Sequence, residues 1–320
     1  MLRSSLIYLS KAAWARRMVT GWGFAWRAAS RFVAGENLDD AIQVVKQLNE
    51  KGIAATLDHL GEHISTTEAA HKAVEAINSI AFAINQAGVR ANISIKLTQI
   101  GMNLGEELCS KHLEWVLRCA KEVGVFVRLD MEDSPWVDTT LNLYRLMRDQ
   151  YHLDNCGVVI QSYLYRSEAD IRLLAEEGGR VRLCKGAYQE PAEIAYPKKS
   201  DVDASYDRLT RIMIDGALNR GAVAVSPDGR TPPLLAVASH DPERLEYAKA
   251  YAAQVGLPKE ALEFQMLYGI RRDLQDQAVE QGYPVRVYVP FGTEWYPYYV
   301  RRLAERPANV WFFVSNFFRQ

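Results

Sequence analysis

Short runs of apolar and β-branched residues recur along the chain, each separated from the next by a longer amphipathic stretch. Strand-sized apolar runs that alternate with helical periodicity are typical of alternating strands and helices. Eight such runs are present, at residues 54–61 (AATLDHLG), 92–98 (NISIKLT), 126–132 (FVRLDME), 157–163 (GVVIQSY), 181–187 (VRLCKGA), 234–239 (LLAVAS), 262–267 (LEFQML) and 285–290 (VRVYVP).

The ends of the intervening helices carry signals of their own. Ser65 and Glu68 have the spacing of a capping box, and Gly88 stands where that helix should end. Ser134 followed by Pro135 predicts the start of another helix. Further glycines fall between a helical pattern and the next strand, at Gly124, Gly178, Gly179, Gly221, Gly256 and Gly282.

Eight strand–helix units predict an α/β fold, a closed (βα)8 barrel of the TIM type, because parallel strands need helical crossovers. An open doubly wound sheet should carry a glycine-rich dinucleotide loop after its first strand, and residues 58–63 (DHLGEH) do not supply one. We divide the chain into a basic helical segment packed on the barrel, residues 1–34, and a catalytic barrel domain, residues 35–320.

The segment 1–34 is distinctive because it contains basic residues and no acidic one. Its cations are Arg3, Lys11, Arg16, Arg17, Arg27 and Arg31. We favour helices packed on the barrel, since the aromatic content suits a core. A helix on an anionic membrane surface is the first alternative. A transit peptide is the weakest, because no convincing cleavage pattern is present.

Composition narrows the class of protein. The chain has 320 residues, 48% of them hydrophobic, and a net charge of -1, which fits a globular protein and gives no electrostatic reason to expect nucleic acid. Its four cysteines are scattered without a metal-ligand spacing, so we expect free thiols, a reducing compartment and a cytoplasmic location. No apolar run is long enough to span a bilayer.

Polar residues collect where the predicted strands end, and in a (βα)8 barrel the active site lies at that end. Any one of them has an ordinary structural explanation, such as a helix cap. Their convergence on one rim nevertheless predicts a functional site. The residues are Asp58, Glu62, Lys96, Asp130, Gln161, Arg182, Lys185, Ser239, His240, Asp241, Gln265 and Tyr288.

A catalytic metal is disfavoured, because His240 is the only strand-end histidine outside the loop that carries His59 and His63. A Schiff-base aldolase is the main alternative, since it needs a strand lysine near another cation, as Lys185 is near Arg182. Lys96 is a second candidate, although an ion pair with Asp130 on the adjacent strand would keep it charged. A catalytically inactive barrel used for binding is a third class.

A large anionic cofactor across the rim is another interpretation. Gly186 and Ala187 leave room for backbone N–H groups to approach a ligand. Gln161 and Gln265 offer amides for the edge of a heterocycle. Arg182, with Lys185, would supply positive charge where a reduced ring becomes anionic.

The last helical stretch carries a possible anion clamp. Tyr298, Arg301, Arg302 and Glu305 share one helical face. A solvated basic face with a weak Arg301–Glu305 pair explains this pattern as well as paired guanidinium groups on a small carboxylate do. The residues alone leave both open.

Several long strings, in the right order from about residue 31 to about residue 309, resemble the proline dehydrogenase family, and most of all its bacterial monofunctional branch. They are TLDHLGE, SIKLTQIG, RLDMEDS, QSYLYR, VRLCKGAYQEP, ASHDP, EFQMLYGIRRDLQ and VRVYVPFGTEWYPYYVRRLAERPAN. The resemblance implies a distorted (βα)8 barrel with noncovalent FAD that oxidises L-proline to Δ1-pyrroline-5-carboxylate. It also implies electron transfer to membrane quinone, peripheral contact with the inner membrane, and functional coupling to a pyrroline-5-carboxylate dehydrogenase.

The resemblance assigns roles to residues at matching positions. Substrate binding falls to Lys96, Tyr188, Leu267, Tyr288, Arg301 and Arg302, with the cations on the carboxylate and the others around the ring. Catalytic positions are Asp130, which would hold Lys96, and Arg182, near flavin N5. Flavin contacts are Met131, Gln161, Arg182, Lys185, Gly186, Ala187, Ser239, His240 and Gln265. Glu62 resembles the gate residue that pairs with Arg301.

Hydride transfer from the proline Cδ to flavin N5 is the implied chemistry, and a smaller residue at Tyr288 would favour hydroxyproline. Two positions depart from the family, since Cys184 stands where Val is usual and Ser239 where Thr is usual. We expect altered flavin packing there rather than lost function. Residues 226–233 form a segment longer than the common pattern, with no evident function.

Overall fold

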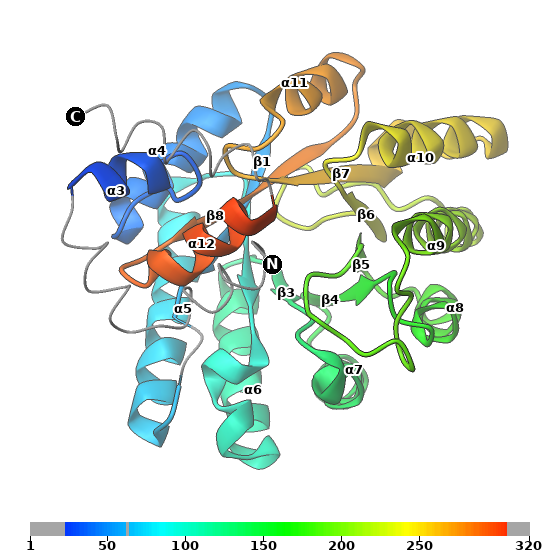
Figure 1. Ribbon diagram of the computed structural model, residues 1–320. Coiled ribbons are helices and arrows are strands. Elements are labelled where there is room, and N and C mark those ends of the chain that lie inside the picture. Colours follow the sequence, from blue (N-terminus) through cyan, green and yellow to red (C-terminus); the bar gives the residue numbers. More distant parts are fainter. Residues whose placement is uncertain (1–22, 62–63, 306–320) are drawn as a thin grey trace.

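Eight parallel strands form a closed barrel with helices packed around it (Figure 1). The computed structural model describes residues 23–61 and 64–305. Each strand pairs with the next along the chain, and β8 pairs with β1. The predicted (βα)8 barrel is therefore confirmed.

The strands are short and the helices lie between them in sequence. The strands are β1 (Ala54–His59), β2 (Ala91–Ile95), β3 (Val127–Leu129), β4 (Cys156–Gln161), β5 (Val181–Cys184), β6 (Leu235–Ala238), β7 (Leu262–Leu267) and β8 (Val285–Phe291). The helices are α3 (Gly23–Ala29), α4 (Leu38–Glu50), α5 (Thr67–Ala87), α6 (Glu106–Glu122), α7 (Val137–Arg145), α8 (Ser167–Glu177), α9 (Lys199–Asn219), α10 (Pro242–Val255), α11 (Arg272–Glu280) and α12 (Trp295–Glu305).

All eight predicted strands exist, but several end earlier than the apolar runs do. The run 92–98 stops pairing at Ile95, and Leu97–Ile100 form a short 3-10 turn. The run 126–132 pairs only through Leu129. Polar side chains such as Lys96 and Asp130 therefore lie just beyond the ladder, at what we call the carboxyl-terminal rim.

Two predicted helix starts need correction. The N-cap of α5 is Thr66, whose hydroxyl accepts a hydrogen bond from the Ala69 N–H at 3.2 Å, so the expected capping box at Ser65 is wrong by one residue. Ser134 does not cap a helix, because its hydroxyl donates to Glu190 at 2.8 Å and a 3-10 turn precedes α7. Gly88 ends α5 as predicted.

The main core is one continuous apolar layer between the barrel and the helices, and a second, smaller cluster lies where α3 meets α12. Helix α5 shows the principle: its inner face presents Val74, Ile77, Ala81 and Ile84, spaced three or four residues apart, and each is at most 1% exposed. The four cysteines carry free thiols, as predicted. Burial raises the pKa of the Cys184 thiol to about 12, which makes it an unreactive packing residue.

The long segment 226–233 closes the barrel at the end where the strands begin, and we call it the floor loop. Arg230 donates to the carbonyl oxygens of Val89 and Val123, which precede β2 and β3, at 3.3 and 3.2 Å. The Arg230 carbonyl in turn accepts a hydrogen bond from Asn92 at 3.1 Å. The segment without an evident function therefore has a structural one.

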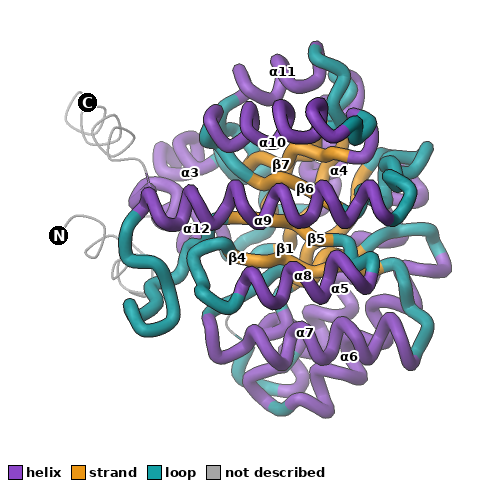
Figure 2. Tube along the Cα trace, turned by 90° about the vertical axis from the view of Figure 1, so that its right-hand side faces the viewer, coloured by secondary structure: helices purple, strands orange, loops and turns teal. Residues whose placement is uncertain are grey.

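The opposite end of the barrel is covered by α3 and α12, which lie together in both views (Figures 1 and 2). The Trp26 and Trp295 rings meet edge to face at 5.4 Å, and Phe32 lies 6.3 Å from Tyr299. The Ala34 N–H donates to the Pro290 carbonyl at 2.9 Å. Residues 1–22 lie outside the described residues, so the N-terminal segment 1–34 as a unit, and its contact with lipid, stay predictions.

No helix within residues 23–61 and 64–305 combines the length and the apolar character that crossing a bilayer requires.

Gly269 is expected to be essential for seating residues 29–35. A Cβ atom there would lie 1.7 Å from the Arg31 carbonyl oxygen, and the backbone φ is +75°. Gly256→Ala is the matched control, because its φ is +78° and no atom lies within 4 Å of the added Cβ. We expect Gly269→Ala to lower the free energy of unfolding by about 1–3 kcal/mol more than the control does, measured by denaturant titration. Equal losses would contradict this close contact.

Candidate functional site

The two cations of the β5 region, Arg182 and Lys185, point to different places. Arg182 extends into the barrel, where its Nη1 donates to Asp130 Oδ1 at 2.7 Å and its Nε donates to Gln265 Oε1 at 2.5 Å. Its side chain is 8% exposed. Lys185 extends away from the barrel axis toward α9 and α10. One strand therefore serves two separate polar networks.

Asp130, which follows β3, accepts hydrogen bonds from residues of three other strands, β2, β5 and β8. Besides Arg182, its donors are the Ser94 hydroxyl at 2.6 Å and the Tyr288 hydroxyl at 2.8 Å. The Arg182 guanidinium carbon lies 5.2 Å from the centre of the Tyr288 ring. Burial, and then the charges of Asp130 and Asp58, raise the pKa of Tyr288 well above its usual value. Tyr288 is thus a neutral donor.

The expected ion pair between Lys96 and Asp130 is wrong. The Lys96 ammonium lies 3.4 Å from Asp58 Oδ1, and Asp130 is paired with Arg182. The register of β1 and β2 explains why Lys96 pairs with Asp58 and not with Asp130. Ser94 of β2 is in register with Asp58 of β1, and the Ser94 hydroxyl already donates to Asp130. Lys96, two residues further along the chain, turns toward β1.

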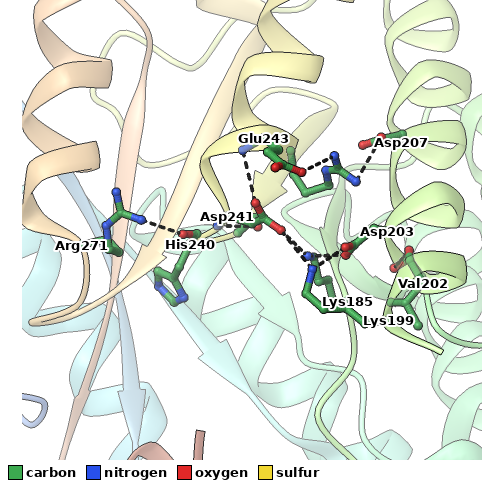
Figure 3. A network of polar contacts seen from close by, with 12 residues as sticks. Lys185, Lys199, Val202, Asp203, Asp207, His240, Asp241, Glu243 and Arg271 are labelled. Carbon is green, nitrogen blue, oxygen red and sulfur yellow. Dashed lines mark hydrogen bonds and ion pairs between the residues drawn. The ribbon is translucent and has the colours of Figure 1, made fainter. Parts of the chain in front are cut away.

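Lys185 is held between two carboxylates, as Figure 3 shows. Its Nζ donates to Asp203 of α9 at 2.5 Å and to Asp241, the N-cap residue of α10, at 2.7 Å. Lys199 also contacts both carboxylates. The network ties two helices to the end of β5, and it leaves Lys185, like Lys96, ion-paired rather than available as a free amine for a Schiff base.

Gly186 has a packing reason that the sequence did not reveal. Its φ is +113°, and an added Cβ would lie 2.3 Å from a ring carbon of Tyr163. The glycine therefore lets the chain pass over the Tyr163 ring. The Tyr163 hydroxyl is buried and has no hydrogen-bond partner among the described residues. Burial raises the pKa of this phenol, so it stays protonated with a hydrogen bond still to give.

The remaining cofactor candidates line the same rim. The Leu267 N–H donates to His240 Nε2 at 2.9 Å, which places the proton of the neutral ring on Nδ1. Gln161 uses its amide N–H on the Glu132 carbonyl at 2.9 Å. Ser239 Oγ accepts from the Asp241 N–H at 3.1 Å. Met131 is buried in the core, and Ala187 follows Gly186.

Two of the predicted substrate neighbours are level with one another. Leu267, the last residue of β7, is in register with Tyr288 of β8. Tyr188 lies on the loop after β5 and is 38% exposed.

Helix α12 carries the predicted clamp. Arg301 and Arg302 are both half-buried. The Arg302 guanidinium carbon lies 5.2 Å from the centre of the buried Tyr298 ring. Arg301 lines a cavity of about 170 Å³ with Leu60, Gly61, Ile64, Glu294, Pro297 and Tyr298. Glu62 and the Glu305 side chain lie outside the described residues, so the gate pairing and the Arg301–Glu305 pair stay predictions.

Sequence reasoning missed three residues of the buried network, Ser94, Glu263 and Arg286. Each sits in a largely apolar strand, two residues from a candidate that was found: Lys96, Gln265 and Tyr288 respectively. Because side chains two apart in a strand share a face, this spacing was the available signal. No cluster of metal-binding side chains occurs among the described residues.

Comparisons with known proteins agree on one family. The family model described as "Proline dehydrogenase" matches residues 41–315. Proline dehydrogenase 1 of Bacillus subtilis is 36% identical over the whole of both chains, and proline dehydrogenase of Deinococcus radiodurans is 41% identical over 91% of this chain and 90% of that protein. A crystal structure of proline utilization A from Bdellovibrio bacteriovorus superposes with a TM-score of 0.79 at 27% identity, over 88% of this chain and 33% of that one.

The Asp203–Lys185–Asp241 network is expected to lose its stabilising effect in acid. Although burial acts to raise them, the hydrogen bonds from Lys185 lower the pKa values of Asp203 and Asp241. Stability from a carboxyl with a lowered pKa is present above its unfolded value, about 3.9, and is lost as pH falls through the folded value. Asp203→Asn should therefore lower the Tm by about 2–4 °C at pH 6, and this difference should shrink as the pH falls below about 3.9 and through the lowered folded-state pKa.

Thermal unfolding of the two proteins across this pH range measures the effect. The exposed Asp276→Asn is the control and should track the parent protein throughout. A deficit of Asp203→Asn that persisted at low pH would show that the network does not act through these charges.

Proposed function

This chain belongs to the proline dehydrogenase family and oxidises proline, the first step of proline catabolism, and we propose that it does so with FAD bound across the carboxyl-terminal rim. The family is generally flavin-dependent. The observation that carries the proposal is the fixed Arg182 guanidinium at the centre of this rim, held by Asp130 and Gln265.

The residues present fit a flavin. The donor set at the rim consists of polar groups of the kind that bind a heterocycle edge: the His240 Nδ1–H, the Gln161 amide and the unpartnered Tyr163 hydroxyl. Glycine at 186, which packs on Tyr163, keeps this part of the rim free of a further side chain. Met131, Lys185, Ala187, Ser239 and Gln265 complete the proposed contact set.

We place the substrate between Tyr288, Leu267 and α12. Arg301, Arg302 and Lys96 would bind the proline carboxylate, since guanidinium and ammonium groups form charge-assisted hydrogen bonds to carboxylates. The ring would lie against Leu267 and Tyr288, with Tyr188 beside it. Glu62 would pair with Arg301 when the substrate is bound.

In this proposal FAD supplies a hydride acceptor for the proline Cδ. The chain's own residues orient the substrate and provide the charges around the reacting atoms. The carboxylate clamp fixes the distance and angle of the reacting carbon. Arg182, whose position Asp130 and Gln265 determine, places a positive charge where negative charge develops. Tyr288 stays protonated and walls the site, and no protein nucleophile is required.

Electron transfer to a membrane quinone, a cytoplasmic location with peripheral contact at the inner membrane, and functional coupling to a pyrroline-5-carboxylate dehydrogenase complete the proposal. The family match and the paired states of Lys96 and Lys185 both count against a Schiff-base aldolase.

Purified protein is expected to be yellow and to bleach when L-proline is added without oxygen. Absorbance near the flavin bands measures this directly, and D-proline serves as the control. A colourless protein that borohydride traps with a carbonyl substrate would instead favour the aldolase. A protein that shows neither behaviour would leave only a binding role.

Arg302→Ala is expected to raise the KM for proline about 10- to 100-fold while flavin stays bound, because a charge-assisted hydrogen bond contributes about 1.5–3 kcal/mol. Arg302→Lys keeps the charge but loses the two-pronged geometry, so its KM should fall between those of the parent and the alanine variant. Steady-state kinetics and the flavin content of each variant measure the two effects. Loss of flavin with an unchanged KM would contradict the clamp.

Activity is expected to rise with pH, because proline must lose its hydride as the neutral amine. Tyr288 cannot cause this rise, since its pKa lies well above its usual value. Tyr288→Phe should therefore keep the same alkaline midpoint for the reductive half-reaction, measured by stopped-flow flavin absorbance. A midpoint that disappeared in Tyr288→Phe would identify the phenol as the titrating group.

A further inference from the structure

Below Arg182, a continuous chain of polar contacts runs through the barrel toward the floor loop. Gln265 accepts from Arg182 Nε at 2.5 Å and donates through its Nε2 to Glu263 Oε1 at 2.6 Å. Arg286 then binds Glu263 with two hydrogen bonds, each of 3.0 Å. Glu263 and Arg286 are completely buried. The arginine at the rim is thus connected to a buried ion pair.

Glu263 determines which way the Gln265 amide faces. A carboxylate can only accept hydrogen bonds and a guanidinium can only donate them. With the amide as observed, its NH2 meets Glu263 and its oxygen meets Arg182. A reversed amide would face oxygen to carboxylate and NH2 to guanidinium, losing both hydrogen bonds in a buried site.

The floor loop helps to anchor the Glu263–Arg286 ion pair at the end of the barrel where the strands begin. Arg286 Nη2 donates to the Gly229 carbonyl at 2.8 Å, and its Nη1 donates to the Ala55 carbonyl of β1 at 2.9 Å. The Arg286 guanidinium is therefore anchored to the backbone as well as to Glu263. A two-pronged ion pair in which each of the three guanidinium nitrogens donates a hydrogen bond is a rigid support.

We propose that the Glu263–Arg286 pair, anchored by the floor loop, is a positioning device for Arg182, acting through the amide of Gln265. This inference rests on the proposed function, in which Arg182 lies beside the flavin. It extends the site from the carboxyl-terminal rim to the opposite end of the barrel. Neither Glu263 nor Arg286 touches substrate or cofactor in this proposal.

The midpoint potential of the bound flavin distinguishes positioning from simple electrostatics. Loss of a buried carboxylate, acting only through space, would make reduction easier and raise the potential. Loss of positioning leaves Arg182 poorly placed to stabilise the negative charge of the reduced ring, so the potential should fall. The two explanations predict opposite signs for Glu263→Gln.

The main test uses Glu263→Met with Arg286→Met in one protein, because this pair of changes keeps the net charge and leaves no unpaired buried ion. In FAD-loaded enzyme we expect a more negative midpoint potential and a kcat for L-proline about 10-fold lower, with the KM within about 2-fold of the parent value. Arg145→Met with Glu177→Met removes an ion pair between α7 and α8, away from this chain of contacts, and is the matched control.

A second measurement asks whether the shift in midpoint potential depends on Arg182. In an Arg182→Met background, the Glu263 and Arg286 changes should shift the potential no further, because the group they position is gone. An unchanged or raised potential in the folded, flavin-loaded double variant would overturn the proposal, as would an equal shift in the Arg182→Met background. If the double variant does not fold, Arg286→Lys takes its place in the test. Its weaker ion pair with Glu263 must also lower the midpoint potential of the flavin.

The parent protein separates this inference from the proposed function. A parent that binds no FAD, or is not bleached by L-proline, contradicts the proposed function itself. A parent that behaves as a flavoenzyme beside variants with unaltered potentials contradicts only the positioning role.

Discussion

The buried ion pair between Arg182 and Asp130 is the constraint from which the interior of this barrel follows. Removing two charges from water costs several kcal/mol per ion unless every remaining donor and acceptor is satisfied. Asp130 therefore also accepts from Ser94 and Tyr288, and Arg182 also donates to Gln265. Three strands besides β5, together with Asp130 just after β3, thus supply polar atoms at or near the rim, where a barrel of this type usually packs branched apolar side chains.

Because the barrel interior is polar, both of its ends need a cover that limits the access of water. At the end where the strands begin, access of water would weaken the buried ion pairs. The floor loop covers this end with Arg230 and Gly229. The carboxyl-terminal rim is covered by α3 and α12, whose contacts are mostly aromatic and apolar. Hydrogen bonds fix the closure by the floor loop, whereas the cover of α3 and α12 depends mainly on non-directional packing, with few hydrogen bonds such as that from Ala34 to Pro290, which suits the end where a ligand must enter.

The eight strands and most of the rim could be predicted from sequence, because strand periodicity and glycine punctuation are local signals. The partners of charged groups could not. Lys96 pairs with Asp58 because of the β1–β2 register, which no pattern along the chain encodes. Gly186 was interpreted through ligand access, yet it is also required by the Tyr163 ring, a contact between two different strand ends. Glu263 and Arg286 were visible as polar residues in apolar runs, but only the closed barrel brings them together.

The charges buried in the barrel interior balance one another. In and around the barrel interior, among the described residues, four cations lie with four anions: Arg128, Arg182, Arg286 and the half-buried Lys96 with Asp58, Asp130, Glu132 and Glu263. Burial, with the nearby charge of Arg182 adding to it, lowers the pKa of Arg128 to about 9, so at neutral pH it remains charged. Gly157 makes room for it, since a Cβ there would lie 2.6 Å from the guanidinium. Because the buried charges balance, it is the placement of the Arg182 guanidinium, and not a net excess of positive charge, that favours a ligand gaining negative charge, which is the requirement that a flavin undergoing reduction would place on its site.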